Sequence, residues 1–352
     1  MIKYLGSKRL LTSVLGDIAT AVDARTAVDL FTGTTRVAQE FKRRGITVTT
    51  VDSATYAHVL AQCYIATDAM GVDKDELSET LAELSELPGR AGYFTETFCV
   101  ASRYFQPKNG ARVDAIRDAI EARYLGNALY PVLLTSLMLA ADRVDSTTGL
   151  QMAYLKQWAA RAHNDLELRI PELLAGRGHS MHGDAMSLVD ELGHVDLVYL
   201  DPPYNQHRYF TNYHVWETLV RWDSPAHYGI ACKRIDARDG ETHSPFNSKP
   251  AMPAALRSVI ARANADVVVV SYNDESWVTT AQITQWLYDA GHAAVALLAF
   301  DSKRYVGAQI GIHNPAGDRV GQISHLRNTE YIFVAGAADR VEAATRSLTA
   351  RR

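Results

Sequence analysis

An apolar run that ends in an acid and two prolines places the strongest constraint on the fold of this chain. The stretch is "VYLDPPY", residues 198 to 204, and the residues from Leu197 to Leu200 show no alternation of apolar and polar side chains. Such a run is typical of a strand buried on both faces of a parallel sheet. Pro202 and Pro203 cannot continue the ladder of strand hydrogen bonds, so Asp201 is predicted at the carboxyl end of the strand. In open α/β sheets, ligands bind at that edge.

The length and charge of the chain limit the classes of function. The chain has 352 residues, of which 47% are hydrophobic and 22% charged, and its formal net charge is −4. At roughly 100 to 200 residues per domain, this length allows a sizeable core and an inserted or second domain. The negative charge excludes a generic polyanion binder, so any contact with nucleic acid must come from local basic patches.

Cysteine, histidine and apolar patterns bear on the location and on metals. The three cysteines are odd in number and lack metal-ligand spacing, as is typical of a reducing cytoplasm. The N-terminus has no apolar core of signal-peptide length, and the longest apolar segment, residues 128 to 141, is too short to span a bilayer. We therefore expect a soluble cytoplasmic protein. We also expect no metal site, because there is no ligand-like grouping of His163, His179, His182 and His194.

A βαβ unit is predicted near the start of the chain, from "TAVDLF" (26 to 31) and "ITVTTVD" (46 to 52). Asp29 ends the first strand, and Gly33 opens the following helix, where a ligand can approach the backbone. Asp52 ends the second strand, where an acid can accept both ribose hydroxyls of an adenosine cofactor. A dinucleotide fingerprint has three glycines and this turn has one, which favours an adenosine cofactor with a charged amino-acid end. "KYLGSK" (3 to 8) offers backbone donors and an ammonium for a carboxylate.

The α/β alternation is interrupted and then resumes. Helical spacing dominates from about residue 54 to residue 175. Helices are expected over 73–87, 109–125, 127–141 and 152–170, and strands return over 180–186, 194–201, 266–272, 293–300 and 330–336. We therefore expect a split catalytic domain (1–53 and 176–340), a helical insert (54–175), a loop-rich stretch (about 223 to 253) and a frayed basic tail (341–352).

Taken in chain order, the motifs resemble a known enzyme family. "KYLGSK", "DLFTGTTRV", Asp52, a helical insert, "GDA" (183 to 185) and "DPPY" are similar to those of the S-adenosylmethionine-dependent DNA adenine-N6 methyltransferases. Within that family they resemble the Dam-like subgroup, whose target-recognition domain lies between the cofactor and catalytic motifs. The resemblance covers nearly the whole chain. It implies an α/β fold, a Rossmann-like methyltransferase sheet with an inserted, mainly helical recognition domain, and it implies S-adenosylmethionine as the cofactor.

The resemblance also implies the residues that bind the cofactor. By this likeness the methionine end is held by Lys3, Tyr4, Gly6 and Lys8, the cofactor is lined by Asp29, Phe31 and Gly33, the ribose is bound by Asp52, and the adenine ring lies beside Asp184 and Ala185. The chain departs from the family at two of its positions. The family often has glycine where Thr35 stands and an aromatic residue where Ala185 stands.

The acid, the prolines and the tyrosine of the opening motif have a chemical explanation. An exocyclic amine on a base is a poor nucleophile, because its lone pair is delocalised into the ring. The Asp201 carboxylate and the Pro202 carbonyl can accept the two amine hydrogens and favour a pyramidal nitrogen. Pro203 helps to fix the distance, and Tyr204 offers a face on which the extruded base can stack. A base inside a duplex cannot reach such a pocket, so base flipping is implied for a double-stranded substrate.

Two segments are candidates for contact with DNA. The insert places basic and polar residues around a helix start, and the stretch after the motif is polar and aromatic. The candidates are Arg103, Lys108, Asn109 and Arg112 in the insert, and Asn205, His207 and Arg208 after the motif. "DSKRYVGAQIGIHN" (301 to 314) could form a hairpin that faces a groove.

Other readings stay open at this stage. Cytosine-N4 methylation uses a similar constellation, commonly with serine in place of Asp201, and RNA adenine methylation is harder to exclude. From another class, the chain could be a catalytically idle DNA-binding module, although intact Asp201, Pro202 and Tyr204 argue against idleness. A cognate restriction endonuclease is a further partner that the resemblance allows.

Overall fold

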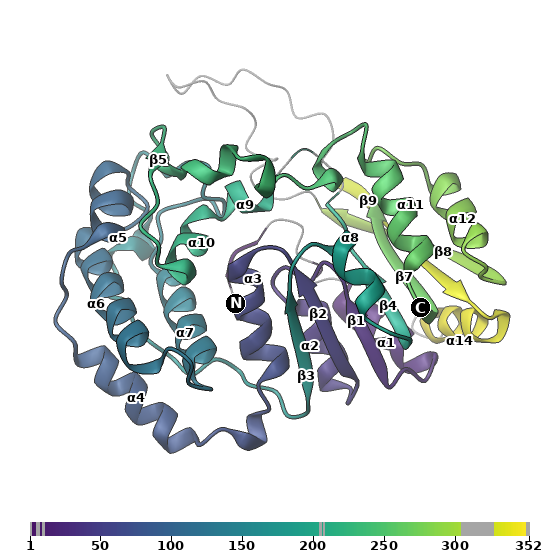
Figure 1. Ribbon diagram of the computed structural model, residues 1–352, viewed down its shortest axis with the longest axis horizontal. Helices are drawn as coiled ribbons and strands as arrows, with labels where there is room; N and C mark the ends of the chain where they lie inside the picture. The colour runs from purple at the N-terminus through teal and green to yellow at the C-terminus, as the bar shows by residue number, and fades with distance from the viewer. Residues whose placement is uncertain are drawn as a thin grey trace. The chain divides into compact units, whose positions relative to one another are not determined.

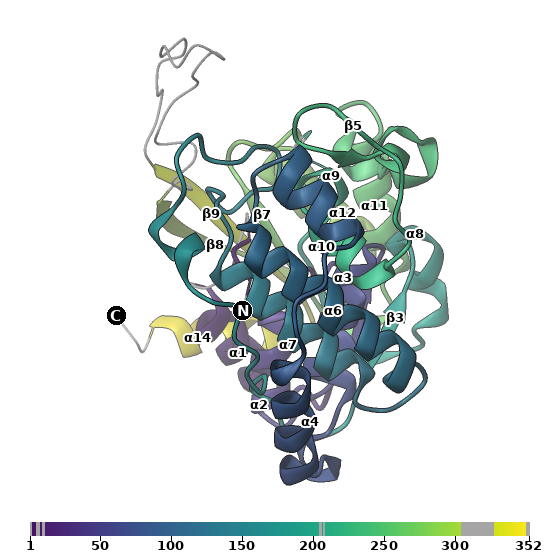
Figure 2. The ribbon, with the colours of Figure 1, turned by 90° about the vertical axis from the view of Figure 1, so that its left-hand side faces the viewer.

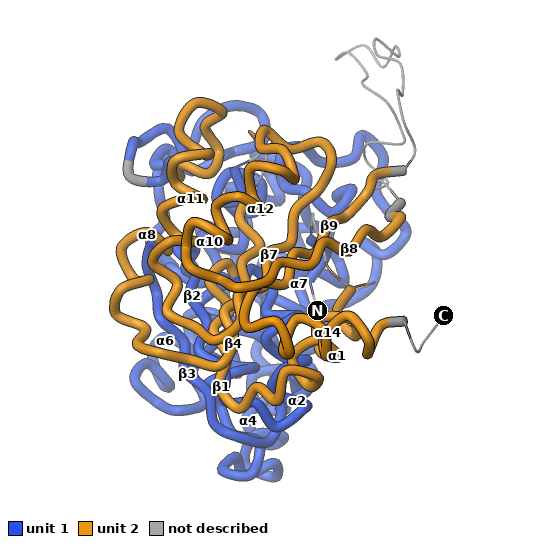
Figure 3. The backbone as a smooth tube through the Cα atoms, turned by 90° about the vertical axis from the view of Figure 1, so that its right-hand side faces the viewer, with its two compact units in different colours: residues 1–4, 32–184, 208–243 blue, residues 5–31, 185–207, 244–352 orange. Residues whose placement is uncertain are grey.

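The structure is a computed structural model that describes residues 2–4, 8, 11–203, 206, 208–303 and 327–349. It has two compact units, which Figure 3 shows in different colours. Unit 1 comprises residues 1–4, 32–184 and 208–243, and unit 2 comprises residues 5–31, 185–207 and 244–352. The predicted division into a catalytic domain and a recognition domain is a functional one, and it stays a prediction.

Unit 1 is mainly helical and contains a pair of parallel strands (Figure 1). Its longer helices and its strand pair are α2 (Arg36–Arg43), α3 (Thr55–Ala61), α4 (Lys74–Glu86), α6 (Pro107–Tyr124), α7 (Tyr130–Arg143), α10 (His214–Arg221), β2 (Thr47–Asp52) and β3 (Gly178–His182). Its short elements are α5 (Tyr93–Thr95), α9 (Tyr209–Asn212), β5 (His227–Tyr228), β6 (Lys233–Arg234), η1 (Gln62–Ala66), η2 (Ala69–Gly71), η3 (Glu96–Ala101), η4 (Ala160–His163), η6 (Ile235–Arg238) and η7 (Gly240–Thr242). Between β2 and β3 the chain forms helices and turns but no strand, as predicted for residues 54 to 175.

Local sequence signals explain where two of these helices begin. The Asp73 side chain accepts hydrogen bonds from the backbone of Asp75 and Glu76 and so caps α4. Pro107 stands in the first turn of α6, where its missing N–H is not needed. Helix α6 packs against α5 and α7, and Figure 2 faces this helical layer.

A buried arginine joins the helical segment, residues 54 to 175, to residues 208–243 within unit 1. Arg117 of α6 is 1% exposed, and its guanidinium donates to the carbonyl oxygens of Leu219 (2.8 Å) and Val220 (2.9 Å) at the end of α10. These carbonyls have no partner within the helix, so the arginine caps it. The chain that follows the DPPY motif is therefore anchored on the helical segment.

Unit 2 holds five strands of the main sheet, in the order β1-β4-β7-β9-β8. Strands β1, β4 and β7 pair in parallel, and β9 is antiparallel to both of its neighbours. The elements of unit 2 are α1 (Thr12–Ala21), β1 (Thr26–Asp29), α8 (Ala185–Leu188), η5 (Val189–Glu191), β4 (Val195–Leu200), η8 (Pro245–Asn247), α11 (Met252–Arg262), β7 (Ala265–Asn273), α12 (Thr280–Asp289), β8 (Ala294–Lys303), β9 (Arg327–Gly336) and α14 (Ala338–Thr349).

The core of unit 2 lies on its central strands. Residues 197–200 of β4 and 267–270 of β7 are each at most 3% exposed, so these strands are covered on both faces. This confirms the burial predicted from the apolar run before Asp201, and it leaves that acid at the carboxyl end of β4. No helix among the described residues is long and apolar enough to cross a membrane.

Two expectations from the sequence were wrong. The helix expected over 152–170 is absent apart from the short η4, and the chain there is irregular. Tertiary hydrogen bonds replace the helical ones: the Leu155 N–H donates to the Ser146 carbonyl, and the Leu166 N–H donates to the Asn109 side chain. The basic tail is not frayed from residue 341, because residues 338–349 form α14, which packs on α1. Most of the proposed hairpin (301–314) lies outside the described residues.

The strand pair of unit 1 generates a stability prediction. A Cβ atom on Gly178 would lie 2.7 Å from the Ile65 carbonyl oxygen and 2.9 Å from that of Val48. Gly178→Ala should therefore lower the free energy of unfolding by about 1 to 3 kcal/mol, as overpacking does. Gly71→Ala is the matched control, because no atom lies within 4 Å of its added Cβ. Urea unfolding of the two variants would test this, and equal midpoints would contradict it.

Candidate active site

Asp52 of unit 1 ties the loop after β1 to the end of β2. One oxygen of its carboxylate accepts the Gly33 N–H at 2.8 Å, and the other accepts the Ala54 N–H at 2.9 Å. Burial raises the pKa of Asp52, while these two backbone donors and the nearby His182 lower it. The carboxylate therefore orders the glycine turn that was predicted to line the cofactor.

The glycine turn carries a strained backbone. Gly33 has a φ of +49°, and Thr35 has a φ of +63°, a conformation that is rare for a β-branched residue. The Thr35 hydroxyl donates to the Thr34 carbonyl and accepts from the Gln39 amide, both at 2.7 Å, which compensates part of the strain. The left-handed backbone at Thr35 gives a physical reason why a glycine would suit this position.

Tyr4 lies over the same turn. A Cβ atom on Gly33 would lie 3.0 Å from the Tyr4 hydroxyl, so any larger residue would have to displace the tyrosine slightly. The Tyr4 ring stacks on Tyr209 and Tyr213, with centroids 5.2 and 4.7 Å apart. The prediction assigned Tyr4 to the cofactor, and the structure adds the two tyrosines as its partners.

Lys3 is bound within unit 1. Its ammonium lies 3.0 Å from the Asp142 carboxylate and 3.1 Å from that of Asp145, and Arg161 pairs with Asp145 at 2.7 Å. Burial raises the pKa of Asp142, and Lys3 lowers it. Lys3 thus joins the N-terminus to the end of α7, and its predicted contact with the methionine end would require it to share these carboxylates.

The other predicted cofactor residues also lie at the ends of strands. Asp29 ends β1 in unit 2 and is 1% exposed, and Phe31 packs edge-on against Phe246 with their centroids 4.9 Å apart. Asp184 follows β3 in unit 1 and is partly exposed, and the buried Ala185 begins α8 in unit 2. Their predicted contacts with the cofactor stay predictions.

In unit 2, the Asp201 carboxylate lies against an ammonium. The Lys8 Nζ lies 3.1 Å from Asp201 Oδ1 and 2.9 Å from Glu330 Oε2, and the Lys8 side chain is 6% exposed. Burial raises the pKa of Asp201 to about 6, with Lys8 lowering it and Glu330 raising it further. The ammonium of Lys8, predicted to hold the methionine end, thus faces Asp201, the predicted catalytic residue.

The remaining motif residues are only partly described. Pro202 is buried and Pro203 is half-buried, directly after Asp201. Gly6, Tyr204, Asn205 and His207 lie outside the described residues, and their predicted roles stay predictions.

Two residues of the helical segment that were predicted to contact DNA bind the irregular stretch at 152–166. Arg103 donates to the Lys156 carbonyl (2.9 Å) and lies over the Trp158 ring. Lys108 donates to the His163 carbonyl (2.8 Å) and pairs with Asp165, yet its side chain is still 51% exposed. Each of these two cations could bind a phosphate only while it keeps its present protein partners or by giving up some of those hydrogen bonds.

Two more DNA candidates have internal partners as well. Asn109 is 1% exposed and binds both the Asn164 carbonyl and the Leu166 N–H, so we assign it a structural role. Arg112 donates to the Ser85 carbonyl at 2.8 Å. In the segment after the motif, Arg208 donates to the Ala237 carbonyl at 3.1 Å.

Sequence reasoning missed several neighbours of the predicted residues. Glu330, Asp142, Tyr209 and Tyr213 were not identified. The i, i+4 spacing of the two tyrosines in "YFTNY" was the signal available for them. The two acids come from distant parts of the chain and carried no local signal.

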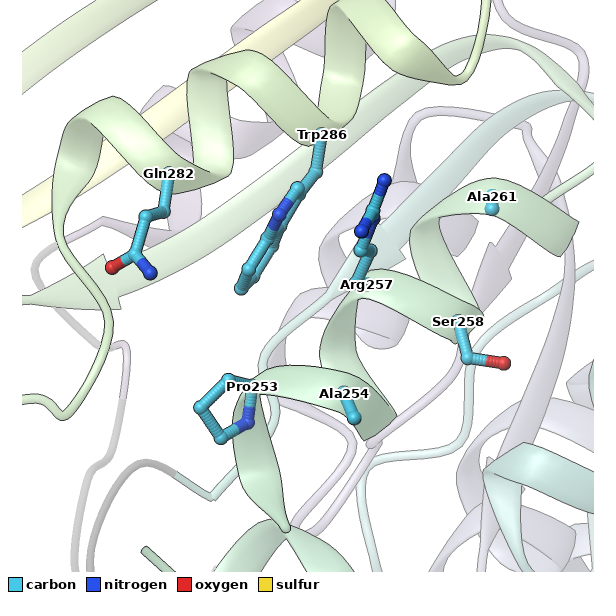
Figure 4. A pocket seen from close by; sticks show the side chains of 7 residues that line it. All are labelled: Pro253, Ala254, Arg257, Ser258, Ala261, Gln282 and Trp286. Atoms are coloured by element: carbon cyan, nitrogen blue, oxygen red, sulfur yellow. The ribbon is translucent and has the colours of Figure 1, made fainter. Parts of the chain in front are cut away.

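Unit 2 also has a pocket that none of these residues lines. Figure 4 shows it between α11 and α12, with Trp286 and Arg257 facing each other across it. It is lined by Pro253, Ala254, Arg257, Ser258, Ala261, Gln282 and Trp286, and none of these was predicted for the site.

Comparison with known proteins decides the family. Residues 4–282 match the model of the D12 class N6 adenine-specific DNA methyltransferases. The chain belongs to this family. It is 30% identical over 298 residues to the type II methyltransferase M.NlaIII of Neisseria lactamica, which covers 80% of this chain and 86% of that protein. It is also 30% identical over 306 residues to the modification methylase StsI of Streptococcus sanguinis, covering 81% of this chain but 46% of that protein.

Membership of the D12 class establishes the reaction. The chain is an S-adenosylmethionine-dependent enzyme that methylates the N6 amine of adenine in DNA. The glycine turn is compatible with this cofactor, since the Asp52 carboxylate beside Gly33 is the type of acceptor that binds ribose hydroxyls, and that contact stays a prediction. When bound, S-adenosylmethionine supplies the methyl group.

The Asp52 carboxylate generates a prediction on cofactor affinity. Asp52→Ala should weaken S-adenosylmethionine binding by roughly 1 to 3 kcal/mol, since it removes a charged acceptor. Calorimetry with an analogue that lacks the ribose hydroxyls shows whether the variant loses affinity because a contact with the ribose is gone or because the glycine turn is less ordered. The wild type should bind this analogue less well than the parent cofactor, and the variant should bind both alike.

A matched control is available in the same unit. Asp68 also accepts hydrogen bonds from two backbone N–H groups, those of Met70 and Gly176, away from the glycine turn. Asp68→Ala should leave the affinity for S-adenosylmethionine unchanged. An Asp52 variant that still discriminates between the two ligands would remove Asp52 from the ribose site.

Proposed function

We propose that this DNA adenine methyltransferase activates a flipped adenine with the acceptors at the end of β4. The Asp201 carboxylate and the Pro202 carbonyl accept the two hydrogens of the N6 amine and direct its lone pair toward the methyl group. As the nitrogen–carbon bond forms, the sulfur–carbon bond of the sulfonium breaks, and the amine loses one proton. Tyr204 provides the stacking face for the base.

The observation that supports this role is the environment of Asp201. Its pKa is raised to about 6 by burial, which makes it a better acceptor than an exposed aspartate. Its Oδ1 atom is in contact with Lys8, so the carboxylate is held in place before the substrate binds. A carboxylate in this setting can take up the proton that the amine releases near neutral pH.

Base flipping and a double-stranded substrate belong to the same proposal. An amine stacked and paired within a duplex cannot reach two acceptors at the end of a buried strand. The proposal therefore requires one adenine to leave the stack. Replacing the base that pairs with the target adenine by an abasic analogue should tighten DNA binding, because less pairing energy is lost on flipping.

Substitution of Asp201 is the decisive test of the proposal. Asp201→Ala should abolish methyl transfer and leave the affinities for DNA and S-adenosylmethionine largely intact, because the carboxylate acts on the amine mainly in the transition state. Transfer of labelled methyl groups to DNA from a methylation-free host would measure this. Analysis of the modified base would also distinguish N6-methyladenine from N4-methylcytosine.

An acid elsewhere in unit 2 serves as the control. Asp190 is exposed and pairs with Arg262, so Asp190→Ala should retain activity. An Asp201→Ala enzyme that works within a few-fold of the wild type would rule out the proposed role.

We also propose that the helical segment positions the enzyme on DNA phosphates. Its cations have internal partners, yet Lys108 is half-exposed and a phosphate could share each of them. The triple variant Arg103→Gln, Lys108→Gln and Arg112→Gln should weaken DNA binding. It should also reduce the salt dependence, by about 0.9 in slope for each phosphate that the variant no longer neutralises.

A second triple variant controls for net charge. Arg257→Gln, Arg262→Gln and Arg346→Gln remove the same charge from unit 2, where each arginine pairs with an acid. This variant should keep the wild-type salt slope. If both triple variants keep that slope, the cations of the helical segment act only as clamps and do not contact DNA.

The named relatives support a proposal for the cellular role. M.NlaIII is a type II methyltransferase and StsI a modification methylase, and we propose that this chain likewise protects DNA from a cognate restriction endonuclease in the cytoplasm. Mapping modified bases after expression in a methylation-free host would identify the recognition sequence. An endonuclease partner would have to cut that sequence when it is unmodified and leave it intact when it is methylated.

A further inference from the structure

The ammonium of Lys8 lies between two carboxylates inside unit 2. Its Nζ is 3.1 Å from Asp201 Oδ1 and 2.9 Å from Glu330 Oε2. The three side chains are 6%, 18% and 14% exposed for Lys8, Asp201 and Glu330, so water screens them little. One positive charge is therefore shared by two negative ones.

Backbone contacts fix the positions of both Lys8 and Glu330. The Lys8 carbonyl accepts hydrogen bonds from the N–H groups of Leu11 and Thr12 and from the Thr12 hydroxyl, so Lys8 is tied to the first turn of α1. Glu330 lies within β9, opposite Asn273 of β7 and Phe300 of β8. The carboxylate thus meets a cation held by a helix start and an anion held by a strand.

The chemistry explains why such sharing would matter. An ammonium paired with Asp201 alone would stabilise the ionised carboxylate and make it a poor acceptor for the proton of the amine. An unpaired carboxylate at this depth would stay protonated, and a carboxylic acid is a weaker acceptor that cannot take up the proton released by the amine. Sharing the ammonium with Glu330 places Asp201 between these limits.

We propose that Lys8 and Glu330 are positioning residues for methyl transfer: Lys8 keeps Asp201 ionised and in place, and Glu330 limits how strongly Lys8 holds it. This rests on the role proposed above for Asp201. The direction of the shifts agrees, since Lys8 lowers the pKa of Asp201 and Glu330 raises it. Among the described residues of unit 2, Tyr199, whose hydroxyl is bonded to Ser271 at 2.9 Å, interacts with Asp201 and Lys8, and Asp29 interacts with Tyr199.

The test is the pH profile of single-turnover methyl transfer to DNA from a methylation-free host, from about pH 5.5 to about pH 9. Lys8→Met should move the acidic limb to higher pH by at least roughly one unit, so activity falls by about twofold near pH 7, by close to tenfold at the acidic end of the range, and returns at high pH. Glu330→Gln, which has the same shape, should move the limb to lower pH by about half a unit or more. Shifts in opposite directions, and recovery at high pH, are not expected from a general loss of structure.

Three controls keep the test decisive. Lys8→Arg retains the charge and should keep the acidic limb near that of the wild type. Glu342→Gln removes an exposed partner of Arg346 in the same unit and should leave the profile unchanged. Direct titration of Asp201 by carbon NMR in aspartate-labelled protein, assigned with Asp201→Asn, reads the same shifts without cofactor or DNA.

The possible results separate this inference from the proposed function. Suppose that the wild type methylates adenine, that Asp201→Ala does not, and that Lys8→Met and Glu330→Gln both keep the acidic limb of the wild type. The positioning role is then wrong and the role of Asp201 stands. The same holds if both variants shift the limb in one direction. If Asp201→Ala retains activity, both proposals fail.

Discussion

A carboxylate at the end of β4, largely removed from water, is the feature on which the proposed chemistry depends. The covered strand ends at Asp201, whose side chain is 18% exposed and has therefore lost most of its hydration. An isolated charge there would be costly, so an ammonium must accompany it. Lys8 supplies that ammonium, and Glu330 shares it. The first turn of α1, the end of β4 and the start of β9 are linked through this group of charges.

A second carboxylate organises unit 1 in a different way. Asp52 has no cation among its hydrogen-bond partners in the described part of the chain, and two backbone N–H groups satisfy it instead. One of them belongs to Gly33, so the acid holds the strained turn in which Thr35 adopts a left-handed backbone. Hydrogen bonds from buried threonine and glutamine side chains help to keep this conformation. The same residue type thus orders a backbone in one unit and faces a cation in the other.

The cations of the helical segment show that a basic cluster can either contact phosphates or bind other parts of the protein. Their residue types and their place at a helix start favoured contact with phosphates. In the structure Arg103 and Lys108 bind the irregular chain between residues 152 and 166, where the predicted helix is missing, and Arg112 binds the Ser85 carbonyl. A lysine whose side chain is half-exposed can do both, whereas a fully buried asparagine cannot. Burial therefore separates Lys108 from Asn109, although the two are adjacent in the sequence.

The sequence alone determined the elements whose signals are local. The buried run before Asp201, the acids that end the first two strands and the helices of the insert follow from periodicity, β-branched runs, and glycine and proline positions. The cofactor and the reaction followed from the motifs taken together. The tertiary structure alone decided which charges meet. Lys8 and Glu330 are more than 300 residues apart, and an ion pair between them leaves no periodic pattern in the chain. The irregular stretch after α7 was unpredictable for the same reason, because distant side chains provide the hydrogen bonds that a helix would have made internally.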